Sequence, residues 1–280
     1  MEDGINDPTL DEIGKWSEIK LAIIREYAQP YSQILANQPG LYHMYIDGFA
    51  GAGMHISKRT RQKIAGSPLN VISVQPKFRE YHFVELDPVK ADHLRCLFAD
   101  HAEVHIHEGD CNEVVPVKLL PLVRWDQRRR ALCLLDPYGL HLDWAVIQAA
   151  GRLKTIDLLL NFPMMDMNMN VLWHDPASVK PEQAARMTRF WGDESWKNAA
   201  YSPEQTLFET ILNKTDNVRV AEAFAKRLKD AASFKYVAEP LPMRNSTQAI
   251  VYYLFFASQN RTAHKIISYI FGKYRDTGGA

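Results

Sequence analysis

The chain has 280 residues, of which 46% are hydrophobic and 24% charged, enough apolar sequence for one large folded domain or one domain with an insertion. Lys plus Arg and Asp plus Glu both number 33, which excludes the strongly basic composition that favours non-specific nucleic-acid binding. Local basic patches are still compatible with this balance.

The first residues are acidic and lack the basic and apolar regions of a signal peptide. The longest apolar run, 249–257, is too short to cross a bilayer, so we expect a cytoplasmic protein without a membrane partner. Three cysteines, Cys96, Cys111 and Cys133, lie far apart without a CxxC pair, which favours small buried side chains over a disulfide framework or a zinc site. We therefore expect no metal site.

A helix is predicted over 11–35, because apolar residues recur there at helical spacing. They are Ile13, Trp16, Ile19, Ile23, Ile24, Tyr27 and Tyr31. Pro30 predicts a kink or a break in this helix, since proline lacks the backbone N–H of the helix interior. We assign residues 1–40 to an N-terminal helical lead-in and residues 41–280 to the main α/β domain.

Short apolar runs then alternate with helical patterns. Strands are predicted at 42–46, 81–86, 104–107, 131–135 and 156–160, with helices from about 68 and at 88–98, 112–122 and 142–153. This alternation predicts a mostly parallel sheet covered by helices on both faces. Each strand ends in a polar residue: Asp47, Glu85, Asp110, Asp136 and Asn161. Because ligands of such sheets bind beyond the carboxyl ends of the strands, these residues predict a site at that edge.

After Asn161 the alternation stops. Residues 162–203 are rich in Met, Asn, Trp and Pro and predict an insertion or lid beside the strand ends. Its methionines fit an adaptable binding surface and packing over the sheet equally well; they are Met164, Met165, Met167 and Met169. Further helices are predicted at 203–212, 218–232 and 263–274, with strands at 234–238 and 249–257.

The stretch MYIDGFAGAG, residues 44–53, places an acid and three glycines behind a buried strand. A nucleotide P-loop requires Gly-Lys followed by Ser or Thr, and no such triplet follows Gly53. A dinucleotide fingerprint that begins at Gly51 requires a third glycine where the chain has Ile56. What remains suits a ligand without phosphates that makes close backbone contacts, and a nucleoside with a charged amino-acid tail fits this description.

This stretch resembles motif I of class I S-adenosylmethionine-dependent methyltransferases, in the DxFxGxG form of nucleic-acid-methylating enzymes. The resemblance implies S-adenosylmethionine as the cofactor, with contacts from Asp47, Gly48, Phe49, Ala50, Gly51 and Gly53. It places Asp47 near the amine of the amino-acid tail and Glu85 on the ribose hydroxyls, where a carboxylate can accept two hydrogen bonds. Asp110, with Cys111 beside it, matches the acid near adenine.

More narrowly, the chain resembles the three-Cys-motif partner protein (TcmP) family. The similar segments are a Trp-bearing first helix, YIDGFAGAG, the Gly-Ser-Pro-Leu of 66–69, FVELDP, GDCN and LLDPYGL. The resemblance covers most of the chain and is strongest over 16–163. It implies a Rossmann-like class I methyltransferase fold, with a mostly parallel seven-stranded sheet, helices on both faces and an insertion after the fifth strand. It also implies a partner protein that carries a three-cysteine motif.

The segment LLDPYG supplies the candidate catalytic residues, Asp136 and Tyr138. In amino-methylating relatives the pattern is Asp or Asn, Pro, Pro, aromatic: the acid accepts a hydrogen bond from the target amine and the aromatic ring stacks on the base. Here Tyr138 occupies the position of the second proline, and Gly139 that of the aromatic residue. Either Tyr138 stacks from a shortened loop, or the site accepts something other than a flipped base.

Other charged residues have two readings. Lys58, Arg59, Arg61 and Lys63 follow motif I and could contact phosphates, although a solvated charged loop is slightly favoured. His105 and His107 lie on one face of a strand, where a structural role is favoured over metal binding.

Two functions from different classes therefore remain. The first is an S-adenosylmethionine-dependent methyltransferase whose acceptor would be a nucleic-acid base. The second is a non-catalytic, cofactor-binding or regulatory partner of a three-cysteine-motif protein. A nicotinamide-dependent oxidoreductase is a distant third, disfavoured by Ile56.

Overall fold

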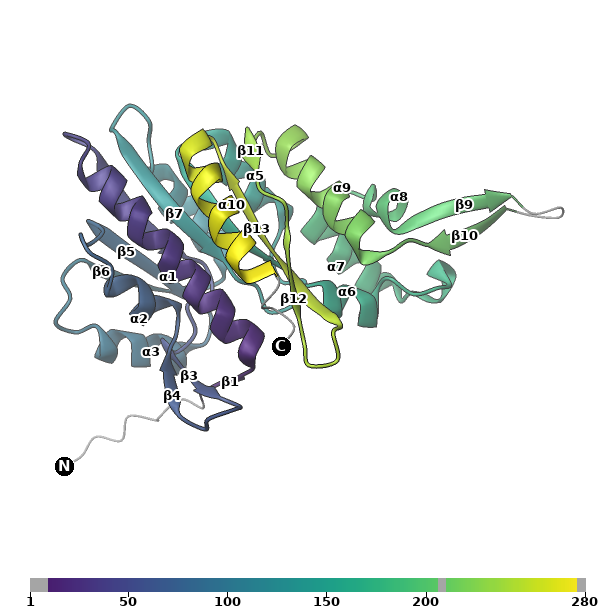
Figure 1. The fold of residues 1–280 in the computed structure, drawn as a ribbon, viewed down its shortest axis with the longest axis horizontal. Coiled ribbons are helices and arrows are strands. Elements are labelled where there is room, and N and C mark those ends of the chain that lie inside the picture. Colours follow the sequence, from purple (N-terminus) through teal and green to yellow (C-terminus); the bar gives the residue numbers. More distant parts are fainter. Residues whose placement is uncertain (1–9, 206–209, 276–280) are drawn as a thin grey trace.

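The computed structural model describes residues 10–205 and 210–275. Its central sheet contains five parallel strands: β2 Tyr42–Asp47, β5 Glu80–Glu85, β6 Val104–Glu108, β7 Arg129–Leu135 and β8 Ile156–Phe162. They lie in the order β8–β7–β2–β5–β6 (Figure 1). Each strand begins and ends within two residues of the predicted one, so the parallel core of the predicted α/β fold is confirmed.

An antiparallel strand, β13 Ile250–Ser258, extends the sheet beyond β8. Two short strands pair with its other edge: β11 Tyr236–Val237 and β12 Leu241–Arg244. They act as one edge strand interrupted around Pro240, which has no N–H to donate to β13. The sheet therefore has eight strands, and the predicted count of seven is corrected by this interruption.

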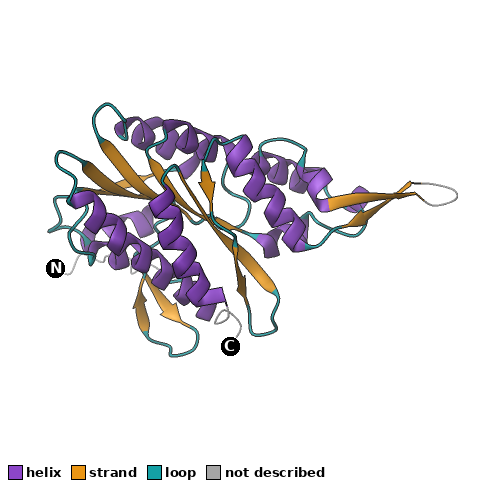
Figure 2. Cartoon of the chain, turned by 45° about the horizontal axis from the view of Figure 1, so that its top comes forward, coloured by secondary structure: helices purple, strands orange, loops and turns teal. Residues whose placement is uncertain are grey.

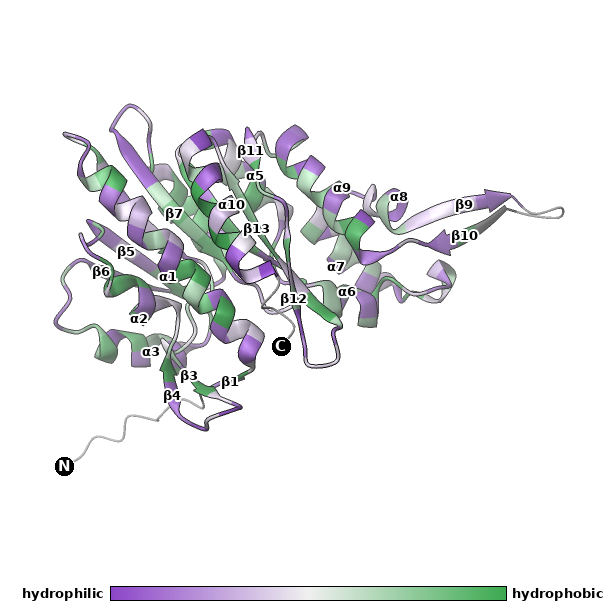
Figure 3. Ribbon diagram, in the orientation of Figure 1, coloured by the Kyte–Doolittle hydropathy of each residue, from purple (hydrophilic) through white to green (hydrophobic). Residues whose placement is uncertain are grey.

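Helices cover both faces of the sheet (Figure 2). One face carries α1 Lys15–Ala36, α2 Ser67–Ile72, α3 Pro88–Leu97 and α10 Arg261–Arg275. The other carries α4 Cys111–Val114, which continues as the π-turn η1 Val115–Leu119 and the 3₁₀-turn η2 Leu120–Leu122, with α5 Trp144–Leu153 and α9 Asn217–Asp230. Helix α1 continues through Pro30, so the sequence-predicted break is absent. The apolar residues of β7 and β13 lie between these two helical layers (Figure 3).

The segment after β8 folds into α6 Met164–Asn170, the turn η3 Pro176–Ser178, α7 Pro181–Trp191, α8 Trp196–Ala200 and the strands β9 Tyr201–Gln205 and β10 Thr210–Lys214. The helix predicted over 203–212 is wrong where the structure describes it, because β9 and β10 pair as an antiparallel hairpin; its residues 206–209 lie outside the described part. This hairpin projects from the body of the molecule (Figure 1). Met164 and Met167 are buried in the core, whereas Met169 is exposed.

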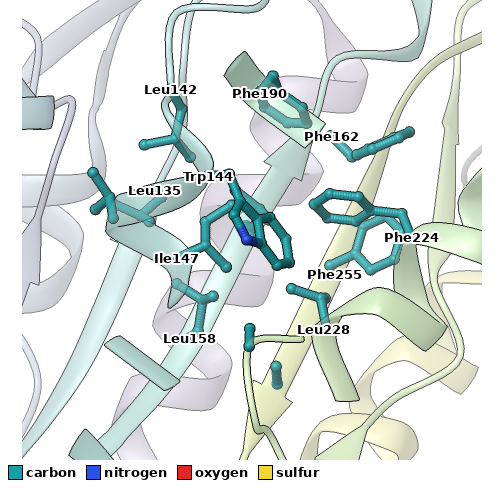
Figure 4. Close-up of a cluster of buried hydrophobic side chains, with 14 of the residues drawn as sticks. Leu135, Leu142, Trp144, Ile147, Leu158, Phe162, Phe190, Phe224, Leu228 and Phe255 are labelled. Atoms are coloured by element: carbon teal, nitrogen blue, oxygen red, sulfur yellow. The ribbon is translucent and has the colours of Figure 1, made fainter. Parts of the chain in front are cut away.

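An aromatic cluster joins this inserted segment to the sheet. Phe224 of α9 lies 4.6 Å from Phe162 and 5.3 Å from Phe255 between ring centroids, and it stacks with Phe190 of α7 (Figure 4). Trp144 of α5 meets the same ring edge-on at 5.8 Å. Aromatic pairs of this geometry add packing energy to the burial of their area. The insertion is therefore anchored in the core beside the strand ends.

A small sheet lies beside the start of α1, away from the β9–β10 hairpin (Figure 1). It consists of β1 Glu12–Ile13, β3 Met54–Ser57 and β4 Lys63–Ala65, and it stands beside the first turns of α1 (Figure 1). The chain thus passes from the glycine-rich stretch directly into a β-hairpin, and α2 begins only at Ser67.

Candidate functional site

The polar residues that end the parallel strands meet at one edge of the sheet. Because β7, β2, β5 and β6 are neighbours and parallel, Asp136, Asp47, Glu85 and Asp110 follow adjacent strand ends. These four acids, the loop 48–53 and α1 form the candidate site.

The loop 48–53 crosses the ends of two neighbouring strands. The Gly48 N–H donates to the Leu134 carbonyl of β7 at 2.9 Å, and the Ala50 N–H donates to the Val84 carbonyl of β5 at 2.9 Å. A Cβ at position 48 would lie 2.7 Å from the Cys111 Sγ, so this position of the loop favours glycine. Gly51 has a φ of 64° and faces open space, which leaves its backbone accessible to a ligand.

Glu85 is bound to this loop. Its Oε2 accepts the Gly51 N–H at 2.7 Å, and its Oε1 accepts the Asp87 N–H at 2.9 Å. The side chain is partly exposed, and a carboxylate has lone pairs beyond these two bonds. Glu85 can therefore both shape the loop and accept hydroxyl hydrogen bonds, and its assignment to the ribose stays a prediction.

Asp110 and Cys111 support the loop from the neighbouring strand end. Asp110 caps α4 by accepting the Asn112 N–H at 2.8 Å, the local role that an acid before a helix commonly has. Cys111 is buried against Gly48, and burial raises the pKa of its thiol well above the ordinary value. Asp110 is exposed, and its predicted contact with adenine stays a prediction.

Asp47 is fully buried behind the loop. Its Oδ1 accepts the Phe49 N–H at 3.1 Å, and its Oδ2 accepts the Ser67 hydroxyl at 2.6 Å. Burial raises the pKa of the Asp47 carboxyl to about 7, although these two hydrogen bonds act in the opposite direction. In this arrangement Asp47 joins the loop to the start of α2, and its predicted contact with the cofactor amine stays a prediction.

Asp136 is paired with a lysine that the sequence reasoning missed. Lys20 of α1 forms an ion pair and hydrogen bond with the Asp136 carboxylate, with side-chain exposures of 10% and 23%. Lys20 lies in the apolar stripe of α1, four residues after Trp16 and seven before Tyr27. The sequence does contain an indication of this pair, because a lysine lies at a core-facing position of the helix. Buried lysines are rare unless they are paired.

The segment after Asp136 is tied to the insertion and to α4. Tyr138 is 91% exposed, so it stacks on no other part of the described structure. Asp166 of α6 accepts the Leu140 N–H at 2.9 Å and pairs with Arg186 of α7 at 3.2 Å. On the other side, the Asn112 amide donates to the His141 carbonyl at 3.0 Å. These contacts determine the path of the 137–143 segment.

Three histidines away from this edge contact one another. His82 lies 3.1 Å from His107 between ring nitrogens and stacks with His105. In the described part of the chain, no group of three or more His, Cys, Asp or Glu side chains could hold a metal. A separate groove of about 620 Å³ lies along α1, between β4, α2 and Tyr274, away from the four acids.

The sequence matches no protein-family model and no curated protein. Among solved structures, protein LPL1258 from Legionella pneumophila str. Philadelphia 1, described as family-model DUF519, is similar over 92% of this chain and 94% of that chain, with a TM-score of 0.52 and 12% identity. A weaker likeness is to the N-terminal domain of EvdMO1 with SAH bound: TM-score 0.42, 14% identity, 85% of this chain and 81% of that chain. The 23S rRNA methyltransferase ErmE follows with a TM-score of 0.37, 11% identity and coverages of 86% and 68%.

The likeness to LPL1258 concerns the fold, which is the Rossmann-like α/β fold with the central parallel sheet described above. None of the described helices has the length and apolar character needed to cross a membrane.

We expect Gly139→Ala to lower the free energy of unfolding by about 1–3 kcal/mol, because the residue has a φ of 65° and its new Cβ would lie 2.6 Å from the Asp166 Oδ2. Gly272→Ala in α10 is the matched control, since a Cβ there meets nothing within 4 Å and alanine favours a helix. Urea denaturation of both variants measures the difference. Equal stability of the two variants would contradict the close contact at Gly139.

Asp47 makes the stability of the protein depend on pH. Because the pKa of its carboxyl is raised from 3.8 to about 7, the folded chain keeps a proton that the unfolded chain has released between these values. The free energy of unfolding should therefore fall as the pH rises from about 4 to about 7. Asp47→Asn removes this titration, and we expect the variant to gain about 2–4 kcal/mol relative to wild type between pH 4.5 and 7.5.

Chemical denaturation at both pH values measures this gain. Asp100→Asn, in an exposed turn, is the control and should follow the wild type. A constant difference between Asp47→Asn and wild type across this range would show that Asp47 is not the group responsible.

Proposed function

We propose that the protein is an S-adenosylmethionine-dependent methyltransferase that acts on a nucleic acid. The observation that carries the proposal is the loop 48–53, which lies across two parallel strand ends with its Gly51 N–H bound to Glu85. This places a glycine backbone with open space beside it next to an acid with free lone pairs, the combination that suits a nucleoside with an amino-acid tail.

The residues present fit this cofactor better than a dinucleotide. A dinucleotide pyrophosphate is bound at the N-terminus of a helix that follows the glycine-rich turn. In this chain the turn leads into β3, whose third residue is Ile56, and the next helix begins only at Ser67. A β-hairpin therefore separates this turn from the next helix, whereas a dinucleotide site has the helix directly after the turn.

In the proposed complex the backbone of 48–53 and Glu85 hold the nucleoside and its tail, with Asp110 near the base. The bound cofactor supplies an electrophilic methyl group on a sulfonium sulfur. The protein then has to position the acceptor and accept its proton, and Asp136 is the carboxylate at the adjacent strand end.

One observation favours a second function. Asp136 is paired with Lys20, and Tyr138 points into solvent, so the pair of groups that would hold a flipped base is not assembled. The alternative is a cofactor-binding or regulatory module that does not transfer methyl groups and associates with a three-cysteine-motif protein. Methyl transfer itself distinguishes the two functions.

We expect Glu85→Ala to weaken binding of S-adenosylmethionine by about 1–3 kcal/mol, because it removes charge-assisted hydrogen bonds to the ribose and releases Gly51. Isothermal titration calorimetry with S-adenosylmethionine and, in parallel, with NAD measures the affinities. Glu108→Ala, at the end of the neighbouring β6, is the control and should bind as the wild type does. Tighter binding of NAD than of S-adenosylmethionine to the wild type would overturn the cofactor assignment.

We expect radiolabelled S-adenosylmethionine to label nucleic acid in the presence of the wild type, and Asp136→Ala to reduce the rate by about 100-fold or more, since it removes the proton acceptor. DNA, RNA and a three-cysteine-motif protein are tested as acceptors. Cofactor binding without labelling of any acceptor would favour the regulatory module. Equal weak labelling by wild type and Asp136→Ala would remove Asp136 from the catalytic assignment.

A further inference from the structure

The ion pair between Lys20 and Asp136 places a buried ammonium beside the carboxylate that is proposed to accept the proton. The Lys20 ammonium is held by the Asp136 carboxylate on one side and lies 5.2 Å from the centre of the Tyr252 ring on the other. The Tyr252 hydroxyl in turn donates to the Trp16 carbonyl at 2.9 Å, one helical turn before Lys20. The ammonium is therefore confined between α1 and the sheet, where its field is screened little by water.

The sign of this charge discriminates between acceptor atoms. When a neutral amine attacks a methyl group, positive charge develops on nitrogen, and a neighbouring ammonium opposes it. When a hydroxyl attacks, it gives up its proton and negative charge develops on oxygen, which the same ammonium stabilises. The ammonium beside the Asp136 carboxylate thus disfavours attack by an amine and favours attack by a hydroxyl.

The loop after Asp136 also disfavours an amine acceptor. In the amine-methylating pattern that this segment resembles, an aromatic residue stacks on the flipped base from the position that Gly139 occupies here. Here Gly139 has a φ of 65° and a Cβ would collide with Asp166, so no aromatic side chain fits there. Tyr138 is exposed instead, where it could stack on a nucleotide outside the site.

A basic turn lies beside the N-terminal end of α1. Lys58, Arg59 and Lys63 are exposed on the β3–β4 hairpin and pair with no acid among the described residues, whereas the neighbouring Arg61 pairs with Glu12 (Figure 1). Cations at this place suit the phosphates of a nucleic acid that enters the site.

We propose that the Lys20–Asp136 pair selects a hydroxyl acceptor, so that methyl transfer is directed to a ribose 2′-hydroxyl of RNA and not to a base amine. The inference rests on the proposed methyltransferase function. In the step, the acceptor oxygen forms a bond to the methyl carbon as the carbon–sulfur bond breaks. The electron pair of that bond stays on sulfur, and the hydroxyl proton passes to the Asp136 carboxylate and then to solvent. Asp136 touches the acceptor, while Lys20 is a positioning residue that holds the carboxylate and supplies the positive field.

The first experiment uses single-stranded RNA and DNA pools of random sequence, each incubated with the wild type and labelled S-adenosylmethionine. We expect label on RNA alone, recovered as 2′-O-methylnucleosides after nuclease digestion and mass spectrometry, because only RNA carries the 2′-hydroxyl. Label on DNA or on base amines of RNA would overturn the inference. So would the absence of label on both pools from a protein that binds the cofactor, whereas failure to bind the cofactor would overturn the proposed function itself.

The second experiment tests Lys20. We expect Lys20→Met, which keeps the length of the side chain and removes its charge, to lower kcat on RNA by about 100-fold or more, with cofactor affinity by calorimetry within about twofold of the wild type. Lys20→Arg restores the charge and should recover about tenfold or more of the lost rate. Lys273→Met is the control, since it removes a lysine that pairs with Glu26 on the surface. A wild-type kcat in Lys20→Met, or equal losses in the Met and Arg variants, would overturn the role of Lys20.

Discussion

The parallel hydrogen bonding of β2 between β5 and β7 is the constraint on which the rest of the structure depends. It brings three strand ends side by side, and the loop 48–53 can then donate backbone N–H groups to β7 and β5 at once. Glu85 reaches Gly51 only because their strands are neighbours. Backbone pairing of the strands is thus what places the acids close together at this edge.

Two carboxyl groups at this edge, buried Asp47 and half-buried Asp136, have different partners. Asp47 forms no ion pair with any described residue; it accepts hydrogen bonds from the Phe49 N–H and the Ser67 hydroxyl, and burial raises the pKa of its carboxyl. Asp136 has a cationic partner, because Lys20 forms an ion pair with its carboxylate. Helix α1 therefore covers one face of the sheet and also determines the charge of the candidate site.

The inserted segment after β8 is a structural part of that site. Its aromatic residues pack with Phe224 and Phe162 in the core, and Asp166 holds the backbone that follows Asp136. The sequence indicated an irregular, Met-rich insertion but not this anchoring, because contacts between residues 26 positions apart leave no periodic pattern. The helix predicted over 203–212 is wrong for a different reason: the helical pattern of these residues is a weak local preference, and pairing across the β9–β10 hairpin overrides it.

The sequence by itself determined the five parallel strands, the helices between them and the acids at their ends, since hydrophobic periodicity and glycine spacing are local properties of the chain. It also disfavoured a dinucleotide fingerprint through Ile56. Only the tertiary structure decided that Lys20 lies against Asp136, 116 residues away, and that Gly139 lies under Asp166. These contacts depend on how α1 and the insertion dock on the sheet, and docking is set by packing across the whole core, which no stretch of sequence encodes alone.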